Sequence, residues 1–195
     1  MLILGSNLKD TPVMSLQTGG ELAVTKGAII DPHNLKIVAY QVEGPLLGGK
    51  KTYLRTDDAR ELSDIGFIID SIDDFVAYSD VIKLREIIDL HFYLDGIRVI
   101  NENRQRIGKV TDYTIDVDNF TVQQLTVKRP LLSRFSDTEL LVHRSQITDI
   151  SNDAITIHSE AEIPEHTAIT APGSYVNPFR SQARGTTESI DTIQR

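Results

Sequence analysis

The sequence predicts a mainly β protein: two tandem small β-barrels, joined by a short helix and followed by a disordered tail. The first observation is an internal repeat at an offset of 85 residues, without a gap between Ile30 and Ile65. The second is that short strand patterns dominate both copies, and the third is that apolar periodicity ends near Glu162. The matching segments are Ile30–Leu35 with Ile115–Phe120, Pro45–Leu47 with Pro130–Leu132, and Asp64-Ile65 with Asp149-Ile150.

The length of the repeat defines the domain organisation. Solenoid repeats run to about 20–50 residues, so this longer period indicates a tandem pair of small domains. We expect a first domain over residues 1–78, a connecting helix over 79–90, a second domain over 91–160 and a tail over 161–195. A domain this small buries only about 60% of its unfolded surface, so packing of one copy on the other should stabilise both.

Each copy is expected to contain five or six short strands, as in a small barrel or a curled sheet. A strand opens each copy, near residues 12–16 and 96–101, and a hairpin follows. Its turns are Asp31–Asn34 and Asp116–Asn119, because Asp and Asn favour turn conformations. The apolar phase changes at Gln123-Gln124, which predicts a β-bulge. Further strands are expected at Tyr53–Arg55, Gly66–Asp70, Leu140–Val142 and Asp153–His158.

One segment between the copies breaks the β pattern and predicts the connecting helix. Ser79-Asp80 is a candidate N-cap for this helix, and a strand from Ile87 to Leu94 is the alternative. The apolar residues that would share one helical face are Val81, Leu84, Ile87 and Ile88.

Composition excludes several classes of protein. The chain has no Cys, which rules out disulfides and thiolate metal sites and fits a reducing, cytoplasmic location. Its net charge of −8 argues against direct nucleic-acid binding, which depends on neutralising phosphates. No apolar run approaches the roughly 18 residues of a membrane span, and the first residues lack the basic region of a signal peptide.

Motifs for catalysis or for cofactor binding are missing from the sequence. There is no Gly-x-Ser-x-Gly elbow and no phosphate-binding loop. The histidines are not spaced as metal ligands; they are His33, His91, His143, His158 and His166. We therefore expect no enzyme activity, no catalytic residue, no metal and no cofactor.

The second copy resembles the PRC-barrel family. Residues 101–116 contain a turn, then Ile107-Gly108-Lys109-Val110, a polar pair and an apolar–Asp hairpin, and His143–Ile147 resembles the family's later turn. Members include the cytoplasmic domain of the photosynthetic reaction-centre H subunit and the C-terminal domain of the ribosome maturation factor RimM. The resemblance covers residues 12–160. The first copy departs from it, with Ala23, Val24 and Gly27 at the positions of Gly108, Lys109 and Asp112.

The resemblance implies a protein-interaction adaptor or assembly module, with an unknown protein partner. The second copy adds basic and aromatic residues around the repeated Pro-Leu-Leu, where the first copy has Glu43 and Gly44. The hypothetical partner surface consists of Lys128, Arg129, Arg134, Phe135 and Arg144. A second docking element in the tail would consist of Tyr175, Pro178, Phe179 and Arg180.

Two alternatives to the adaptor stay open. One is a factor for ribosome maturation or RNA metabolism, by analogy with RimM. The other is a small-ligand-binding protein with its site between the barrels. Peripheral association with a membrane complex is also open, and the sequence does not assign an oligomeric state.

Overall fold

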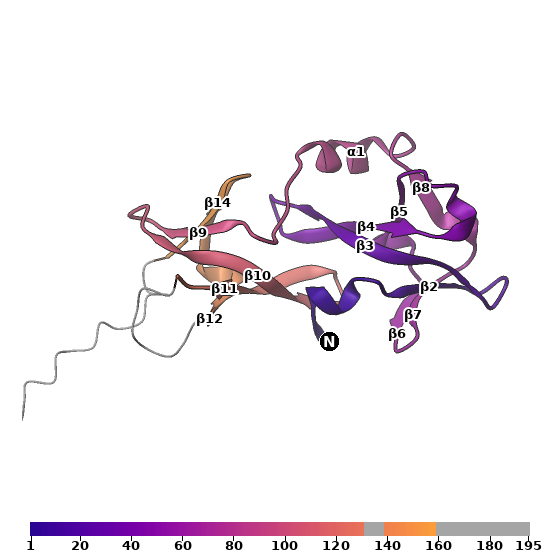
Figure 1. The fold of residues 1–195 in the computed structure, drawn as a ribbon, viewed down its shortest axis with the longest axis horizontal. Coiled ribbons are helices and arrows are strands. Elements are labelled where there is room, and N and C mark those ends of the chain that lie inside the picture. Colours follow the sequence, from indigo (N-terminus) through magenta and orange to yellow (C-terminus); the bar gives the residue numbers. More distant parts are fainter. Residues whose placement is uncertain (131–138, 159–195) are drawn as a thin grey trace, which may run out of the picture. The chain divides into compact units, whose positions relative to one another are not determined.

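The computed structural model describes residues 1–130 and 139–158, which fold mainly as strands, with one α-helix on the outside (Figure 1). All of them belong to one compact unit, Met1–Glu162. Helix α1, Ile82–Asp89, lies between β8 and β9. The strands are β1 (Leu2–Leu4), β2 (Pro12–Ser15), β3 (Glu21–Asp31), β4 (Lys36–Glu43), β5 (Thr52–Arg55), β6 (Glu61–Ser63), β7 (Gly66–Ile69), β8 (Phe75–Ala77), β9 (Arg98–Asn101), β10 (Arg106–Asp116), β11 (Thr121–Lys128), β12 (Glu139–His143), β13 (Ile147–Ile150) and β14 (Ala154–Ile157).

The internal repeat is also a structural repeat. We call β2–β7 repeat one and β9–β14 repeat two. In repeat one the strands lie in the order β6-β7-β2-β3-β4-β5, and in repeat two in the order β13-β14-β9-β10-β11-β12. Within the described residues, the first and last strands of each series do not pair with each other. The mainly β prediction is therefore confirmed, whereas the sheet of neither repeat closes into a barrel in this part of the chain.

The prediction that equivalent residues keep a constant offset of 85 is wrong for the strands that follow β4 and β11. Val42 faces Thr52 in repeat one, while its counterpart Val127 faces Leu140 in repeat two, so the offset rises from 85 to 88. Repeat two therefore has three more residues before its next strand. The later match of two Asp-Ile pairs was a coincidence, because Asp149 takes the place of Glu61 in the ladder.

The predicted bulge is confirmed and occurs in both repeats. In repeat two, Thr114 faces Gln124 and the next residue faces Val122, which leaves Gln123 without a cross-strand partner. In repeat one, Val38 is left out in the same way. An extra residue on one strand increases the local twist, so both long hairpins bend at equivalent points.

The two repeats are joined by a symmetric pair of backbone hydrogen bonds. The amide of Ile37 donates to the carbonyl of Phe120 at 2.7 Å, and the amide of Val122 donates to the carbonyl of Leu35 at 3.0 Å. Leu35 and Phe120 are equivalent residues that end the two predicted turns, and both have positive φ values of 57° and 49°. Because each repeat contributes the same backbone atoms, the joint has approximate twofold symmetry.

One hydrophobic core runs through both repeats. Phe67 of repeat one is fully buried, with its ring stacked on Phe120 of repeat two at 6.0 Å and tilted against Tyr40 at 5.3 Å. Strand β1 pairs with β10, so the first residues of the chain extend the sheet of repeat two. The core of each repeat is therefore completed by residues that are distant in the sequence.

Helix α1 confirms the predicted connecting helix, and the alternative strand does not form. Leu84 on its inner face is buried in a second small core together with Tyr53. The predicted N-cap is wrong: the cap position is Val81, whose side chain makes no capping bond. Asp80 instead accepts a hydrogen bond from the amide of Ala77 at 2.8 Å.

Candidate functional site

Three residues of the expected basic surface lie among the described residues, and Lys128 and Arg129 lie apart from Arg144. Lys128 is exposed at one end of β11, and Arg129 is half-buried, its Nε lacking a hydrogen-bond partner. Because β12 runs antiparallel to β11, Arg144 lies near the other end, roughly 17 Å along the strand from Lys128. There its guanidinium donates to the carbonyl of Asn34 at 3.2 Å and so ties repeat two to repeat one.

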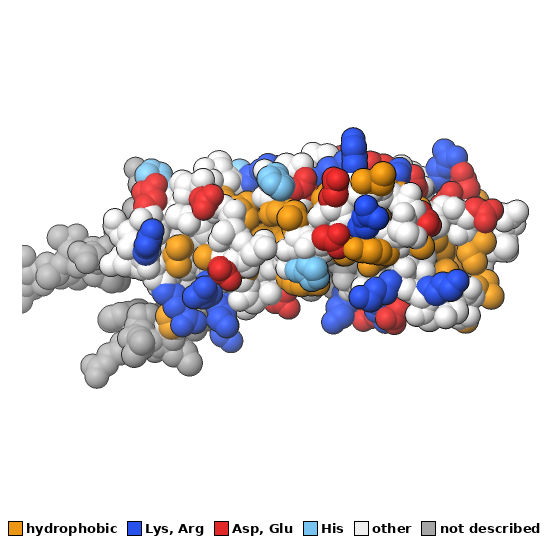
Figure 2. All heavy atoms as spheres, turned by 90° about the horizontal axis from the view of Figure 1, so that it is seen from above, with side chains coloured by type: hydrophobic (Ala, Val, Ile, Leu, Met, Phe, Trp, Pro, Cys, Tyr) orange, Lys and Arg blue, Asp and Glu red, His pale blue; other side chains and the backbone are white. Residues whose placement is uncertain are grey.

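The remaining members of the two expected surfaces lie outside the described residues; they are Arg134, Phe135, Tyr175, Pro178, Phe179 and Arg180. Charges of both signs are interspersed over the face in Figure 2, and a group of Lys and Arg side chains lies at one end. Lys128 and Arg129 lie together at the end of β11, and Lys109 of β10 lies opposite Lys128.

A difference between the repeats appears at β5 and its counterpart β12. In repeat one, β8 adds to the free edge of β5, and α1 lies over the adjoining face (Figure 1). Thr52, Tyr53 and Leu54 of β5 are consequently all buried. The last strand of repeat one is therefore covered both at its edge and on both faces.

Strand β12 has no such cover among residues 1–130 and 139–158, where it pairs with β11 alone. Its burial alternates, with Val142 buried and Leu141 57% exposed. Leu141 is the counterpart of Tyr53, which is only 3% exposed. Repeat two thus presents an open sheet edge with a large apolar side chain, close to Lys128.

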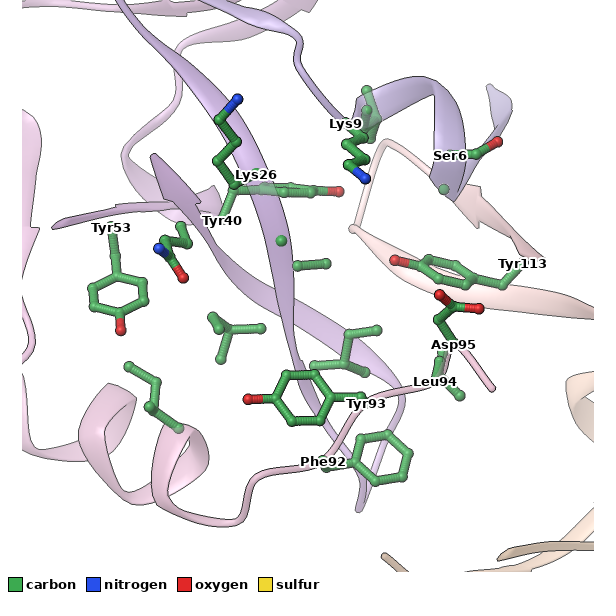
Figure 3. A pocket seen from close by; sticks show the side chains of 18 of the residues that line it. Ser6, Lys9, Lys26, Tyr40, Tyr53, Phe92, Tyr93, Leu94, Asp95 and Tyr113 are labelled. Atoms are coloured by element: carbon green, nitrogen blue, oxygen red, sulfur yellow. The ribbon is translucent and has the colours of Figure 1, made fainter. Parts of the chain in front are cut away.

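The second candidate site is a pocket of about 540 Å³ between the repeats (Figure 3). Strands β3 and β4 of repeat one and β10 of repeat two contribute to its lining. Helix α1, the segment that follows it and the 3-10 turn Gly5–Leu8 complete the lining. A Cβ at Gly5 would overlap the ring of Tyr113, so the turn approaches this ring because Gly5 has no side chain.

Two tyrosines from equivalent hairpins reach the pocket. Tyr40 on β4 is 2% exposed, and its hydroxyl oxygen is buried without a hydrogen-bond partner. Burial raises the pKa of Tyr40 well above its usual value, and the nearby Tyr113 adds to this effect. Their counterparts in the other repeat are Leu125 and Ala28, so each repeat places a tyrosine on a different strand of its hairpin.

The charged groups at the pocket differ in how they are paired. Lys26 is held by Asp10 at 2.6 Å, and this hydrogen bond raises the pKa of Lys26 and lowers the pKa of Asp10. Asp112 accepts hydrogen bonds from the amide and hydroxyl of Ser6 at 3.1 and 2.6 Å. Lys9 also lines the pocket; its ammonium group makes no salt bridge or hydrogen bond within the described residues, although its charge helps to lower the pKa of Asp10.

We expect the stability of the protein to depend on the ionisation of Tyr113 at high pH. Burial, with help from Asp112 and Asp95, raises the pKa of Tyr113 to about 12. The unfolded chain has a tyrosine pKa of about 10, so the stabilisation is fully present below pH 10 and is lost as the pH rises towards about 12. Urea denaturation at pH 8 to 11 should show the wild type losing stability faster than Tyr113→Phe. Parallel curves would contradict this assignment.

The sequence reasoning did not single out the two tyrosines or the open edge. Tyr40 and Tyr113 stand in alternating strand patterns, where an aromatic residue usually belongs to the core. Among the described histidines, His143 caps a 3-10 turn by accepting a hydrogen bond from the amide of Ser145. Within the described residues no cluster of His, Asp or Glu could hold a metal ion, and no helix is long and apolar enough to cross a membrane.

Comparison with known proteins adds no relative: no family model matches the chain, and no curated protein matches it.

Proposed function

We propose that the protein is a cytoplasmic, non-catalytic adaptor that captures an extended segment of a partner protein on the open edge of β12. The observation that carries this proposal is the contrast between the covered β5 and the uncovered β12 in otherwise equivalent repeats. The resemblance of repeat two to PRC-barrel domains supports it, because that family is known for interaction modules in larger assemblies.

The physical basis is the chemistry of a sheet edge. An edge strand presents unpaired amide and carbonyl groups, which can bind a further strand by backbone hydrogen bonds. Repeat one contains an example of this arrangement, because β8 pairs antiparallel with β5 and places Val76 opposite Tyr53. A partner strand on β12 would likewise place one of its residues opposite Leu141.

The exposed side chains at this edge define the partner segment. Leu141 favours an apolar residue on the same face, since cross-strand apolar pairs stabilise a sheet. Lys128 and Arg129 at the end of the neighbouring strand outnumber the exposed Glu139, which faces Lys128, so this end favours an acidic residue of the bound segment. The proposed partner is therefore an extended peptide with an apolar centre and an acidic end.

The test is affinity capture from the native cytoplasm, read by mass spectrometry, with the wild type and Leu141→Lys. We expect Leu141→Lys to lose its stoichiometric partner, because a charge would replace the apolar contact at the edge. Ile65→Lys is the matched control: Ile65 is 63% exposed in the turn between β6 and β7, far from β12 in the ladder, and this variant should retain the partner. Equal capture by wild type and Leu141→Lys would remove β12 from the proposal.

The same experiment separates the other proposals. Capture that is lost only in a chain ending at His158 would assign recognition to the segment of residues 161–195 with Tyr175, Pro178, Phe179 and Arg180. Ribosomal proteins or RNA in the eluate would favour the role in ribosome maturation.

A further inference from the structure

The hydroxyl of Tyr40 is the feature of the pocket that packing does not explain. A buried hydroxyl without a partner destabilises a folded protein, and phenylalanine would fill the same space without that penalty. Repeat two shows that the position accepts an apolar residue, because its counterpart there is the buried Leu125. Repeat one therefore carries a polar group at a position where the fold does not need one.

The groups around this hydroxyl indicate the charge of a ligand. Figure 3 shows the Tyr40 hydroxyl directed to the part of the pocket that Lys9 and the hydroxyl of Tyr113 also face. The Lys9 ammonium group has no ion pair within the described residues and interacts with Asp10 only at longer range, so it supplies a positive charge at the pocket. The hydroxyls and the ammonium group can all donate hydrogen bonds, so together they suit an acceptor that carries negative charge.

Two acidic groups limit how much negative charge the pocket accepts. Asp95 and Asp112 both line it, and both raise the pKa of Tyr113. Asp112 is already bound by Ser6, whereas Asp95 faces the pocket next to Tyr113 (Figure 3). Their repulsion disfavours a dianion such as phosphate and leaves a single carboxylate as the favoured group.

The lining also offers apolar surface for the body of a ligand. Ile29 and Ile30 of β3 and Phe92 and Leu94 after the helix contribute to it, beside polar residues such as Gln41 and Lys51. A volume of about 540 Å³ lies within the range of small-molecule sites. We propose that this pocket binds a small carboxylic acid with an aromatic or branched aliphatic body, whose carboxylate accepts a hydrogen bond from Tyr40 and pairs with Lys9.

Binding requires a small movement of the lining. The Tyr40 oxygen has no contact with solvent in the unliganded protein. Lys9 lines the same pocket and is exposed, so its flexible side chain is free to move. A displacement of this side chain opens the hydroxyl and brings the ammonium group against the incoming carboxylate.

The test uses the full chain and isothermal titration with phenylacetate, benzoate and 4-methylpentanoate, with phenylacetamide as the uncharged comparison. We expect at least one of the acids to bind saturably, and phenylacetamide to bind about tenfold or more weakly than phenylacetate, as for the loss of one charge-assisted interaction. No saturable binding by any of the three acids, or equal binding of phenylacetate and phenylacetamide, would overturn the proposal.

Two variants connect binding to the named groups. Tyr40→Phe should raise the Tm of the unliganded protein by about 2–4 °C, because it removes the unpaired hydroxyl, and should weaken acid binding about tenfold. Lys9→Met should weaken binding similarly, whereas Lys83→Met, an exposed change on α1 outside the pocket, should not. Undiminished binding by Tyr40→Phe would overturn the proposal. Neither variant alters β12, so these results are independent of the adaptor test.

Discussion

Phe67→Ala should lower the free energy of unfolding by about 3–5 kcal/mol, the range for removing a large aromatic side chain from a core. Phe67 is fully buried, and its ring contacts Tyr40 of its own repeat and Phe120 of the other. The lost packing therefore affects both repeats. We expect one cooperative transition at a lower urea concentration, and tyrosine fluorescence and far-ultraviolet circular dichroism should report the same midpoint.

The control for this variant is Ile65→Ala, two residues earlier in the chain. Ile65 is 63% exposed, so its truncation should change the free energy of unfolding by no more than about 0.5 kcal/mol. A Phe67→Ala protein in which repeat two stays folded while repeat one melts would contradict the shared core. Amide hydrogen exchange of β10 and β11 measured against that of β3 and β4 would detect such a separation.

Gly66→Ala should destabilise the protein by about 3 kcal/mol, although it adds only one methyl group. Gly66 has φ +119°, a conformation that other residues rarely adopt, and a Cβ there would overlap the carbonyl oxygen of Pro12. The overlap would separate β7 from β2, whose parallel pairing begins at the next residue, where Phe67 faces Val13. Urea denaturation would measure the loss.

A second Gly→Ala change is the matched control. Gly27 lies within β3, its φ is outside the left-handed region, and a Cβ there meets no atom within 4 Å. Gly27→Ala should be neutral or should stabilise the protein by about 0.5 kcal/mol, because alanine loses less backbone entropy than glycine on folding. Equal stability of the two variants would show that the overlap at Pro12 is relieved without cost.

Local features of the fold could be predicted from the sequence, whereas long-range pairing could not. The turn at Asp116–Asn119, the bulge at Gln123 and the apolar face of α1 depend on neighbouring residues only. The offset of 88 and the open sheet depend on which strands meet, which a pattern in one strand does not determine. Strand β1 was not predicted, because its three residues are too few to show a period. Its partner is also distant in the sequence, since Leu2 faces Asp116 of β10.

The candidate sites were less accessible to sequence reasoning than the fold. The sequence analysis grouped Lys128 and Arg129 with Arg144, which lies towards the other end of the β11–β12 ladder. The sequence pattern also placed Tyr40 in an alternating strand, where it is expected to be an ordinary core residue. Its unpaired hydroxyl results from packing between segments that are far apart in the chain, and no local pattern records it.

The symmetric joint between Leu35 and Phe120 has the geometry of a homodimer interface in which both partners use the same surface. Here both partners belong to one polypeptide, so the association does not depend on protein concentration and survives at any dilution. The two halves are also released from the requirement to be identical, which applies to every residue of a true homodimer. Among the described residues, one half has a cover over β5 while β12 of the other half pairs with β11 alone, so the two halves of this pseudo-dimer differ at equivalent edges.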